Sequence, residues 1–556
     1  MLLDLSLIWP DLAWLLPGGL LYAEMHYRWW PLPNRYFRKE PEILADAPWR
    51  VEPGKPVPLL LLVKDAHHYP ITLERVTIGM ETDNGRRELP EITIGGEIDD
   101  HWWHRTVMLE RPIDSGDISL WVTFHYIIKG RPRTCTTHNL RSLKPQPLRV
   151  HLAGESLPGE DVVWGDLHLH TSFTEDMVEF GAPQEATRQA ASAAGLGFIC
   201  AADHSYDLDD VPGDWFTPDP KLAKWHTSRE EIAALNTQGD GALIVPGEEV
   251  SVRNASDQNV HALVLGHPEF LPGSGDAGER LFRMRSELNV EALVQRIAPG
   301  SIAMAAHPCY QFPLIQQVLV RRGAWKDQDM QHPGIRGLQI LNGRLDEGFN
   351  RGMEKWRGLL LRGHRKFIYA GNDAHGNFNM YRQVRTPFVN LEERSTNLPG
   401  TCRTGVLDVQ PGDMAGILAA LKAGRCIVST GPFINLRLNA EGGTAAIGET
   451  IRARKVEVSL ELGSTTEFGP LADFRLFRGW VGPNSGRAYG EFWTVGGLEE
   501  TLEEVYFDDE RHSAEWKGAY ELQPGTSYFR AEVESRPPGG RIAGLALTNP
   551  IWVESF

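Results

Sequence analysis

The stretch VVWGDLHLH at residues 162–170, followed by GLGFICAADH at residues 195–204, decides the expected fold. Each is a short apolar run that ends in acidic and imidazole side chains, and helical sequence lies between them. Five more such runs follow: ALIVPGEE (242–249), VHALVLGH (260–267), SIAMAAH (301–307), GLQILN (337–342) and FIYAGND (367–373). Strands that alternate with helices are typical of parallel β/α units. The sequence therefore predicts an α/β fold in which residues 160–435 form a TIM-like, seven-stranded β/α barrel.

Two helices stand out between these runs. Residues Pro183 to Ala193 carry proline in the first turn, where its missing N–H costs nothing. Residues Asp346 to Leu361 form an amphipathic run. Both segments are expected to be helical.

The flanking regions have a different pattern. Residues 46–155 alternate apolar and polar side chains between Pro, Gly, Asn and Asp turns, and residues 436–556 return to this alternation. Such short alternating runs predict antiparallel β-sandwiches on both sides of the barrel.

Residues 1–45 form an apolar N-terminal extension. No Lys or Arg precedes its apolar stretch, and Asp4, Pro10 and Asp11 interrupt it, so it resembles neither a signal peptide nor a transmembrane span. We expect the segment to dock on the fold or on a second copy of the chain, and we expect the protein to be cytoplasmic.

The charge balance excludes one class of partner. The chain has 56 Lys and Arg against 73 Asp and Glu, a net charge of −17, with no basic block. This disfavours nucleic acid as a partner. Five scattered cysteines without a CxxC pair indicate reduced thiols. The expected partner is a small-molecule substrate, and homo-oligomerisation stays open.

Ligand-type side chains fall at the ends of the predicted strands. His168 and His170 are two residues apart on a strand, so they face the same side and can chelate one cation. The other strands offer Asp203-His204, Glu248-Glu249, His261, His307 and Asp373 with His375. A lone histidine at a strand end is more often structural. Six such coincidences are hard to obtain from core packing, because unpaired buried polar groups cost several kcal/mol, so we predict a metal site at one rim of the barrel.

These motifs resemble a known family. DLHLHT, AADH, PGEE followed twelve residues later by His261, AAHP and GNDAH match, in order, the motifs of the PHP (polymerase and histidinol phosphatase) superfamily. VSTGPFI and TNPIWVE look like its carbaryl-hydrolase-type branch. The resemblance covers about residues 160–435 and implies a distorted seven-stranded β/α barrel that holds two or three metal ions.

The resemblance also implies a ligand set. One metal would be held by His168, His170, Glu249 and Asp373, a second by Glu249 as a bridge with His261 and His307, and a third by His204 and His375 with either Glu175 or Asp176. Asn372 replaces the serine usual in the last motif. Zinc is the first expectation among the divalent ions, and manganese and iron also suit this donor set.

Paired cations lower the pKa of a shared water and give a hydroxide nucleophile, so the expected reaction is hydrolysis without a covalent intermediate. Asp203, His204 or Asp373 would act as general base or acid.

The substrate is less defined. The branch resemblance favours a small ester, carbamate or amide, and the aromatic, acidic loop with Trp215 would suit a neutral group. A phosphoesterase is the alternative and would use cations such as Arg344. A non-catalytic binding or scaffold protein with a relic site is the second alternative.

Overall fold

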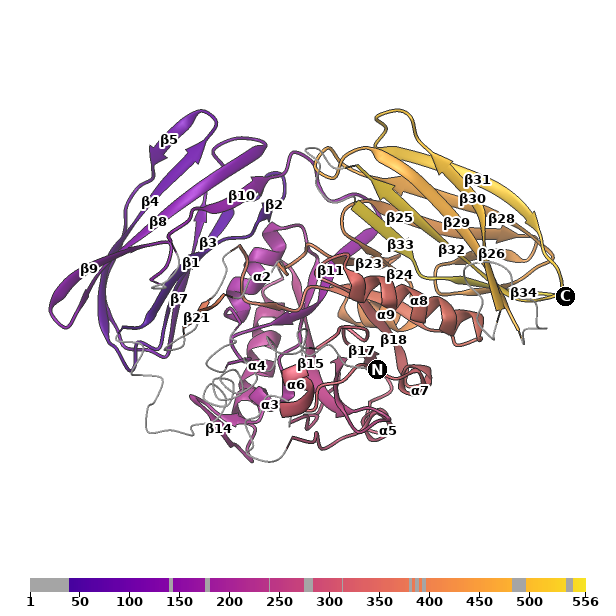
Figure 1. The fold of residues 1–556 in the computed structure, drawn as a ribbon. Helices are drawn as coiled ribbons and strands as arrows, with labels where there is room; N and C mark the ends of the chain where they lie inside the picture. Colours follow the sequence, from indigo (N-terminus) through magenta and orange to yellow (C-terminus); the bar gives the residue numbers. More distant parts are fainter. Residues whose placement is uncertain are drawn as a thin grey trace, which may run out of the picture.

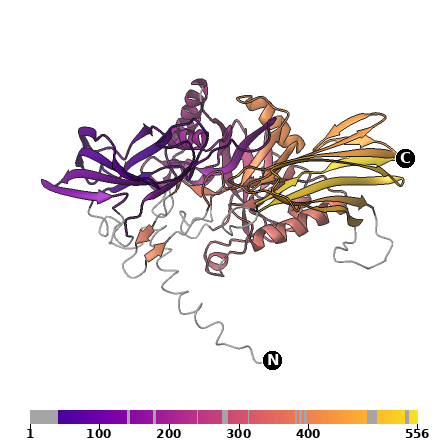
Figure 2. The same cartoon turned by 90° about the horizontal axis from the view of Figure 1, so that it is seen from above.

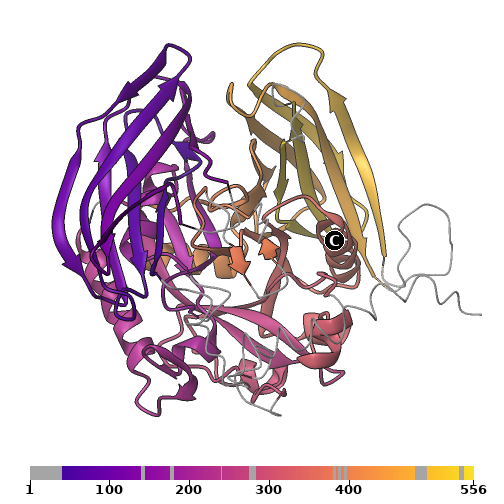
Figure 3. The ribbon, with the colours of Figure 1, turned by 60° about the vertical axis from the view of Figure 1, so that its left-hand side comes forward.

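The computed structural model describes residues 40–139, 144–175, 181–239, 241–274, 284–312, 314–379, 383–385, 390–392, 397–482, 497–536 and 544–556. The predicted apolar extension therefore lies almost wholly outside the described residues, as does Asp176. Two β-rich lobes, one from each end of the chain, flank a central unit (Figure 1). Seen after a 60° turn, both lobes rise from the same side of that unit (Figure 3).

The N-terminal lobe has two sheets that enclose one core. The smaller sheet has the order β1-β3-β7, with β1 (Glu42–Asp46), β3 (Val57–Lys64) and β7 (Trp102–Leu109). The larger sheet contains β2 (Arg50–Val51), β10 (Leu148–Leu152), β8 (Gly116–Ile128), β4 (Ile71–Thr82), β5 (Gly85–Glu88), β6 (Ile92–Ile98) and β9 (Arg131–Thr136). Alternate residues of β8 are buried, the pattern of a strand with one face on a core. Leu59 and Leu120 belong to the shared core between the layers.

The central unit is built around one run of hydrogen-bonded strands. Their order is β19-β18-β17-β16-β15-β12-β11. They are β11 (Val162–His170), β12 (Phe198–Ala201), β15 (Leu243–Arg253), β16 (Asn259–Leu265), β17 (Ile302–Ala305), β18 (Ile335–Asn342) and β19 (Phe367–Gly371). The run curls, so that the short strand β20 (Ala374–His375), which follows β19, pairs with β11.

Helices are few and mostly short in the described part of the chain. They are α2 (Gln184–Ala193), α3 (Ser205–Leu208), α4 (Ala223–Thr237), α5 (Val290–Val294), α6 (Leu314–Leu319), α7 (Asp327–Gln331), α8 (Glu347–Leu361) and α9 (Met414–Ala423). The two helices expected from the sequence are confirmed as α2, with Pro183 as its N-cap, and α8. The Asp346 side chain accepts a hydrogen bond from the Phe349 N–H and so caps α8.

The predicted TIM-like β/α barrel is wrong. β16 pairs antiparallel with both β15 and β17, whereas a β/α barrel requires parallel neighbours. The physical reason lies in the connection: residues 254–258 alone join β15 to β16, and a parallel crossover needs about a dozen residues or more. More of this unit is strand than helix, and the α/β class expected for the chain is therefore wrong as well.

The sheet also continues beyond the central unit. From β11 it passes through β23 (Arg403–Leu407) and β24 (Cys426–Ser429) to β33 (Gly544–Thr548), β32 (Gly525–Ser535), β29 (Leu471–Val481) and β30 (Gly497–Tyr506), in a sheet of 16 strands. The antiparallel pairing of β24 with β33 makes this connection. The expected barrel with separate sandwiches is thus replaced by a largely β architecture whose central sheet runs into the C-terminal lobe.

The C-terminal lobe adds a second layer to that sheet. Its four strands are β26 (Gly443–Ala446), β25 (Phe433–Ala440), β28 (Lys455–Gly463) and β31 (Ser513–Glu521). β27 (Thr450–Arg452) and β34 (Ile551–Ser555) pair at the edge of the large sheet. Leu436 and Val458 of one layer share a core with Leu476 and Val533 of the other. Viewed from above, the two lobes point away from each other across the central unit (Figure 2).

The remaining described strands are short pairs, β13 (Asp210–Val211) with β14 (Asp214–Pro218) and β21 (Gln383–Arg385) with β22 (Asn390–Glu392). Among the described residues, no helix combines the length and apolarity needed to cross a membrane.

Candidate metal centre

Eight of the predicted ligands gather at one edge of the central sheet. His168 and His170 end β11, His204 follows β12, Glu249 lies in β15, His307 follows β17, and Asp373 and His375 follow β19. His261 joins them from β16. Because β16 runs antiparallel to β15, its first residues lie beside the last residues of its neighbour, which places His261 at the same edge.

Within this gathering, three groups of side chains each keep their ligand atoms within 4.8 Å of one another. The groups are His168, His170, Glu249 and Asp373; His204, Glu249 and His261; and His170, His204 and His375. Glu249 and the two histidines His170 and His204 each belong to two groups. The structure therefore brings the carboxylates and imidazoles into three overlapping sets.

The first group centres on the two histidines of β11. Their Nε2 atoms lie 3.2 Å apart. Asp373 Oδ1 lies 3.2 Å from His170 Nε2 and 3.3 Å from His168 Nε2. Glu249 Oε1 lies 3.4 Å from His168 Nε2. Four ligand-type atoms thus face one small volume.

Glu249 occupies the middle of the centre. Its Oε1 lies 2.7 Å from His261 Nδ1 and 3.0 Å from His307 Nε2, and its Oε2 lies 3.0 Å from His204 Nδ1. The carboxylate is buried, with 1% of its side chain exposed. A carboxylate in contact with imidazoles on both sides is suited to bridge two cations.

Two of the candidate ligands have a strained backbone. His307 has φ 28° and Asp373 has φ 53°, in the left-handed region that side chains with a Cβ rarely adopt. Such conformations cost about 1–3 kcal/mol each and cluster at functional sites. Here they coincide with the two residues that leave β17 and β19 and turn toward the centre.

The electrostatics match a site for cations. Burial raises the pKa values of Glu249 and Asp373, yet neighbouring imidazoles hold both well below their usual range. Burial lowers the pKa of His168, but the charges of Asp373 and Glu249 outweigh it and raise this pKa to about 9. Burial and the neighbouring His375 and His204 lower the pKa of His170 well below its usual value. Two ionised carboxylates are therefore enclosed among imidazoles, and the positively charged form of His168 is favoured in the metal-free protein.

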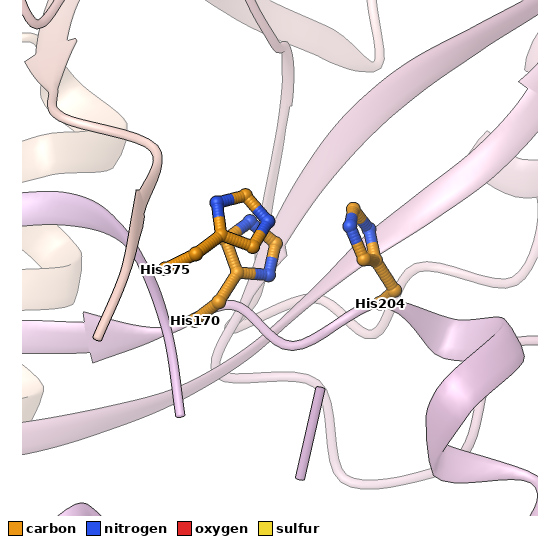
Figure 4. Close-up of side chains that lie close together, drawn as sticks. All are labelled: His170, His204 and His375. Atoms are coloured by element: carbon orange, nitrogen blue, oxygen red, sulfur yellow. The ribbon is translucent and has the colours of Figure 1, made fainter. Parts of the chain in front are cut away.

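The third group consists of histidines alone. The His170 ring stacks on His375 with centroids 4.1 Å apart and lies 4.4 Å from the His204 ring (Figure 4). His375 Nδ1 lies 3.1 Å from the backbone carbonyl of Asp373, which can only accept. Nδ1 therefore carries the hydrogen, and the Nε2 of His375 has the lone pair that a metal requires.

Glu175, one of the two acids expected in that third set, lies in a different cluster. Its carboxylate lies 2.9 Å from Lys64 Nζ and 2.7 Å from His101 Nε2, and it accepts a hydrogen bond from the Trp102 indole at 3.3 Å. All three partners belong to the N-terminal lobe. Glu175 is absent from the three groups above and joins the lobe to the loop that follows β11.

Asp203 organises the same loop. Its Oδ1 accepts hydrogen bonds from the N–H groups of Thr171 and Thr174, and its Oδ2 accepts one from the Thr171 hydroxyl. The Thr174 hydroxyl in turn lies 3.1 Å from His170 Nδ1 and accepts from the His204 N–H. Asp203 is thus placed to orient the loop around the ligands, and three of its acceptor positions are used there.

His261 has a competing neighbour. The Arg322 guanidinium lies within hydrogen-bond distance of His261 Nε2, and an arginine only donates. His261 Nε2 therefore accepts, and its Nδ1 carries the hydrogen toward Glu249. A metal at Nδ1 requires that this guanidinium turns away.

A small, open pocket borders the centre. His307 and Asn342 line it together with the apolar Ile340 and Phe349 and the cationic Arg344. Arg344 is 56% exposed and pairs with Asp346 at 3.4 Å. The structure places this predicted substrate contact beside the centre. The other one, Trp215, lies in β14, and its side chain is outside the described residues.

Several residues at the centre were not among those predicted from the sequence. Gln339 and Asn342 of β18 contact His168 and Asp373, and Lys64 and His101 hold Glu175. A polar residue inside the apolar run GLQILN was a usable signal for Gln339. Lys64 and His101 lie far from Glu175 in the sequence, so no local pattern indicates that they contact it.

The residues present fit divalent cations. Imidazole nitrogens and carboxylate oxygens converge at the centre, and this donor set suits zinc, manganese or iron. Carboxylates held ionised in a buried site also require a compensating charge.

No family model matches the chain, and no curated protein matches it. Among solved structures, a β-glucuronidase from Bacteroides uniformis has 8% identity and a TM-score of 0.17 over 92% of this chain; the chain spans 61% of that protein. An α-2-macroglobulin fragment from Escherichia coli has 10% identity and a TM-score of 0.15, with coverage of 93% and 99%. A cycloisomaltooligosaccharide glucanotransferase from Paenibacillus has 11% identity and a TM-score of 0.16, with coverage of 91% and 71%. Likeness this weak carries no argument about fold or function.

Proposed function

We propose that the chain is a metal-dependent hydrolase that cleaves a small ester, carbamate or amide. The observation that supports this most is the convergence of six histidines and two carboxylates, from six places along the chain, on a common centre around Glu249. The ordered motifs that resemble the PHP superfamily lie at these same positions. The proposal concerns this chemistry, and it does not depend on a barrel.

His168, His170, Glu249 and Asp373 would hold one ion, and Glu249 with His307, His204 and His261 a second. His375 would complete a further set with His170 and His204. Bound divalent ions activate a water molecule near neutral pH and polarise the oxygen under attack.

The chain's own groups supply the proton transfers. Asp373 is the more accessible of the two carboxylates, with 22% of its side chain exposed against 1% for Glu249, and we assign it the contact with the transferred proton. Its Oδ2 lies 4.0 Å from His307 Nε2, at the border of the pocket. Asp203 is committed to three hydrogen bonds in the loop after β11, so we assign it an orienting role.

The pocket beside His307 supports a small substrate. Ile340 and Phe349 offer an apolar wall next to polar groups, as small-molecule sites do. Arg344 in the same pocket favours the second candidate function, a phosphoesterase, since a guanidinium binds phosphate oxygens well.

The proposal is tested by metal analysis and a substrate panel. The metal-loaded protein should hydrolyse p-nitrophenyl acetate or a 1-naphthyl carbamate faster than p-nitrophenyl phosphate or bis-p-nitrophenyl phosphate. His168→Ala should abolish turnover, whereas His267→Ala should not, because His267 is a buried histidine that accepts from the Ala298 N–H and, among the described residues, belongs to none of the three ligand groups. Faster cleavage of the phosphoesters would select the alternative, and no turnover of any substrate would leave a binding protein.

A further inference from the structure

Two amide side chains link the opposite ends of the first ligand group. Gln339 Oε1 lies 3.0 Å from His168 Nδ1, Gln339 Nε2 donates to Asn342 Oδ1 at 3.0 Å, and Asn342 Nδ2 donates to Asp373 Oδ2 at 3.2 Å. The chain of contacts starts at an imidazole of β11 and ends at a carboxylate after β19. Both amides come from β18, which lies next to β19.

A break in the strand register makes this arrangement feasible. In a regular strand, residues three apart point to opposite faces. Between β18 and β19 the register shifts between Gln339 and Leu341, which leaves Ile340 as an extra residue. Such a bulge turns the following side chains over, and it allows Gln339 and Asn342 to meet on one side of the sheet.

The direction of each hydrogen bond follows from the chemistry of the end groups. An ionised carboxylate only accepts, so the NH₂ group of Asn342 faces Asp373. The remaining Asn342 oxygen then accepts from the NH₂ group of Gln339. The Gln339 oxygen is left to face His168, so His168 Nδ1 must donate to it. In the neutral ring, the lone pair of His168 is therefore on Nε2, the atom that faces His170, Glu249 and Asp373.

Because both partners are buried, the Gln339 amide is the hydrogen-bond partner on which His168 Nδ1 depends. Gln339 and His168 are both 0% exposed, so bulk water cannot replace the amide. A buried hydrogen-bond partner that is removed leaves its counterpart unsatisfied, at a cost of about 1–3 kcal/mol.

We propose that Gln339 and Asn342 are positioning residues of the metal centre. Their chain of hydrogen bonds from His168 to Asp373, here called the relay, acts as one unit that fixes the tautomer of His168 and the rotation of the Asp373 carboxylate. The inference deepens the proposed function and rests on it. Neither amide is placed to coordinate the ion itself; each acts through the ligand that it contacts. Partners of this kind typically contribute tenfold to a hundredfold to metal affinity.

The test measures zinc affinity by competition with a chromophoric chelator, using the full-length chain stripped of metal. Gln339→Leu and Asn342→Leu keep approximate side-chain size and remove the amides. We expect each to weaken zinc binding tenfold or more. The double variant should be within about threefold of the weaker single variant, because breaking one relay twice adds little. Gln184→Leu is the matched control: this buried glutamine donates to Ser228 and to no candidate ligand, and it should keep wild-type affinity.

The outcomes separate this inference from the proposed function. If the wild-type chain binds zinc tightly and Gln339→Leu binds it equally well, the relay is wrong and the metal centre stands. Full multiplicative losses in the double variant would also overturn the relay, since they indicate two independent contributions. If the wild-type chain binds no divalent ion, the proposed function itself fails.

Circular dichroism and thermal unfolding identify a variant that has lost its fold, and Gln339→Glu then serves as the second variant. It keeps an acceptor for His168 but cannot donate to Asn342, so, as a break in the same relay, it should weaken zinc binding about as much as Asn342→Leu does; wild-type affinity in Gln339→Glu would contradict the relay.

Discussion

The ammonium of Lys64 lies 2.9 Å from the carboxylate of Glu175, with 4% and 6% of the two side chains exposed. Lys64 ends β3 of the N-terminal lobe, and Glu175 follows Thr174, whose hydroxyl contacts His170 and His204. This buried ion pair therefore ties the N-terminal lobe to the loop that surrounds the metal centre. It gives that lobe a definite structural role beside the centre.

Replacement of Lys64 by Met should destabilise the protein by about 3 kcal/mol, because it leaves a buried carboxylate with one cationic partner fewer. Chemical denaturation monitored by tryptophan fluorescence measures this change. Lys355→Met is the matched control, since Lys355 pairs with Asp327 at 2.7 Å but is 48% exposed, and its loss should cost less than about 1 kcal/mol. Equal losses of unfolding free energy in the two variants would show that the buried Lys64 pair stabilises the protein no more than an exposed pair does.

The same cluster predicts a dependence on alkaline pH. Burial lowers the pKa of His101, but its hydrogen bonds to Asp65 and Glu175 outweigh burial and raise the pKa from 6.5 to about 9. The protonated ring is thus favoured in the folded state. Its contribution to stability is complete below about pH 6.5 and is lost as the pH rises through about 9. The difference in unfolding free energy between wild type and His101→Gln should shrink between pH 6.5 and pH 10; a difference that stays constant over this range would contradict the assignment.

Arg344 distinguishes the two candidate reactions. Arg344→Met should reduce any hydrolysis of bis-p-nitrophenyl phosphate at least tenfold, because a charge-assisted hydrogen bond contributes about 1.5–3 kcal/mol. Hydrolysis of neutral p-nitrophenyl acetate should change less than about threefold. The ratio of kcat/KM values for the two substrates checks this, with Arg285→Met as a control at a 59% exposed arginine that pairs with Asp257. Equal losses on both substrates would mean that Arg344 shapes the pocket rather than binds an anion.

Local patterns predicted the elements and much of the candidate centre. The two-residue spacing of His168 and His170 on a strand is sufficient to predict that they share a face, and their Nε2 atoms lie 3.2 Å apart. Proline at the start of α2 and Asp346 at the start of α8 marked those helices. These features depend on residues close in sequence, so the sequence displays them directly.

Strand direction and long-range pairing were beyond the same patterns. A short apolar run has the same sequence pattern in a parallel and in an antiparallel pair of strands. The parallel pairing predicted for β16 was therefore wrong, because β16 pairs antiparallel with β15. The pairing of β24 with β33 joins residues more than a hundred positions apart. Glu175 looked like a ligand because it follows the first motif, but Lys64 and His101, distant in sequence, hold it elsewhere.

The most direct test of the central claim is the hydrolysis of p-nitrophenyl acetate by the metal-free chain during titration with zinc. We expect negligible turnover without metal and a rise to a plateau at two or three equivalents per chain. Glu249→Gln, which removes the charge at the middle of the centre, should stay near the metal-free rate. Turnover that is independent of zinc, or a Glu249→Gln variant as active as the wild type, would contradict a metal-dependent hydrolase.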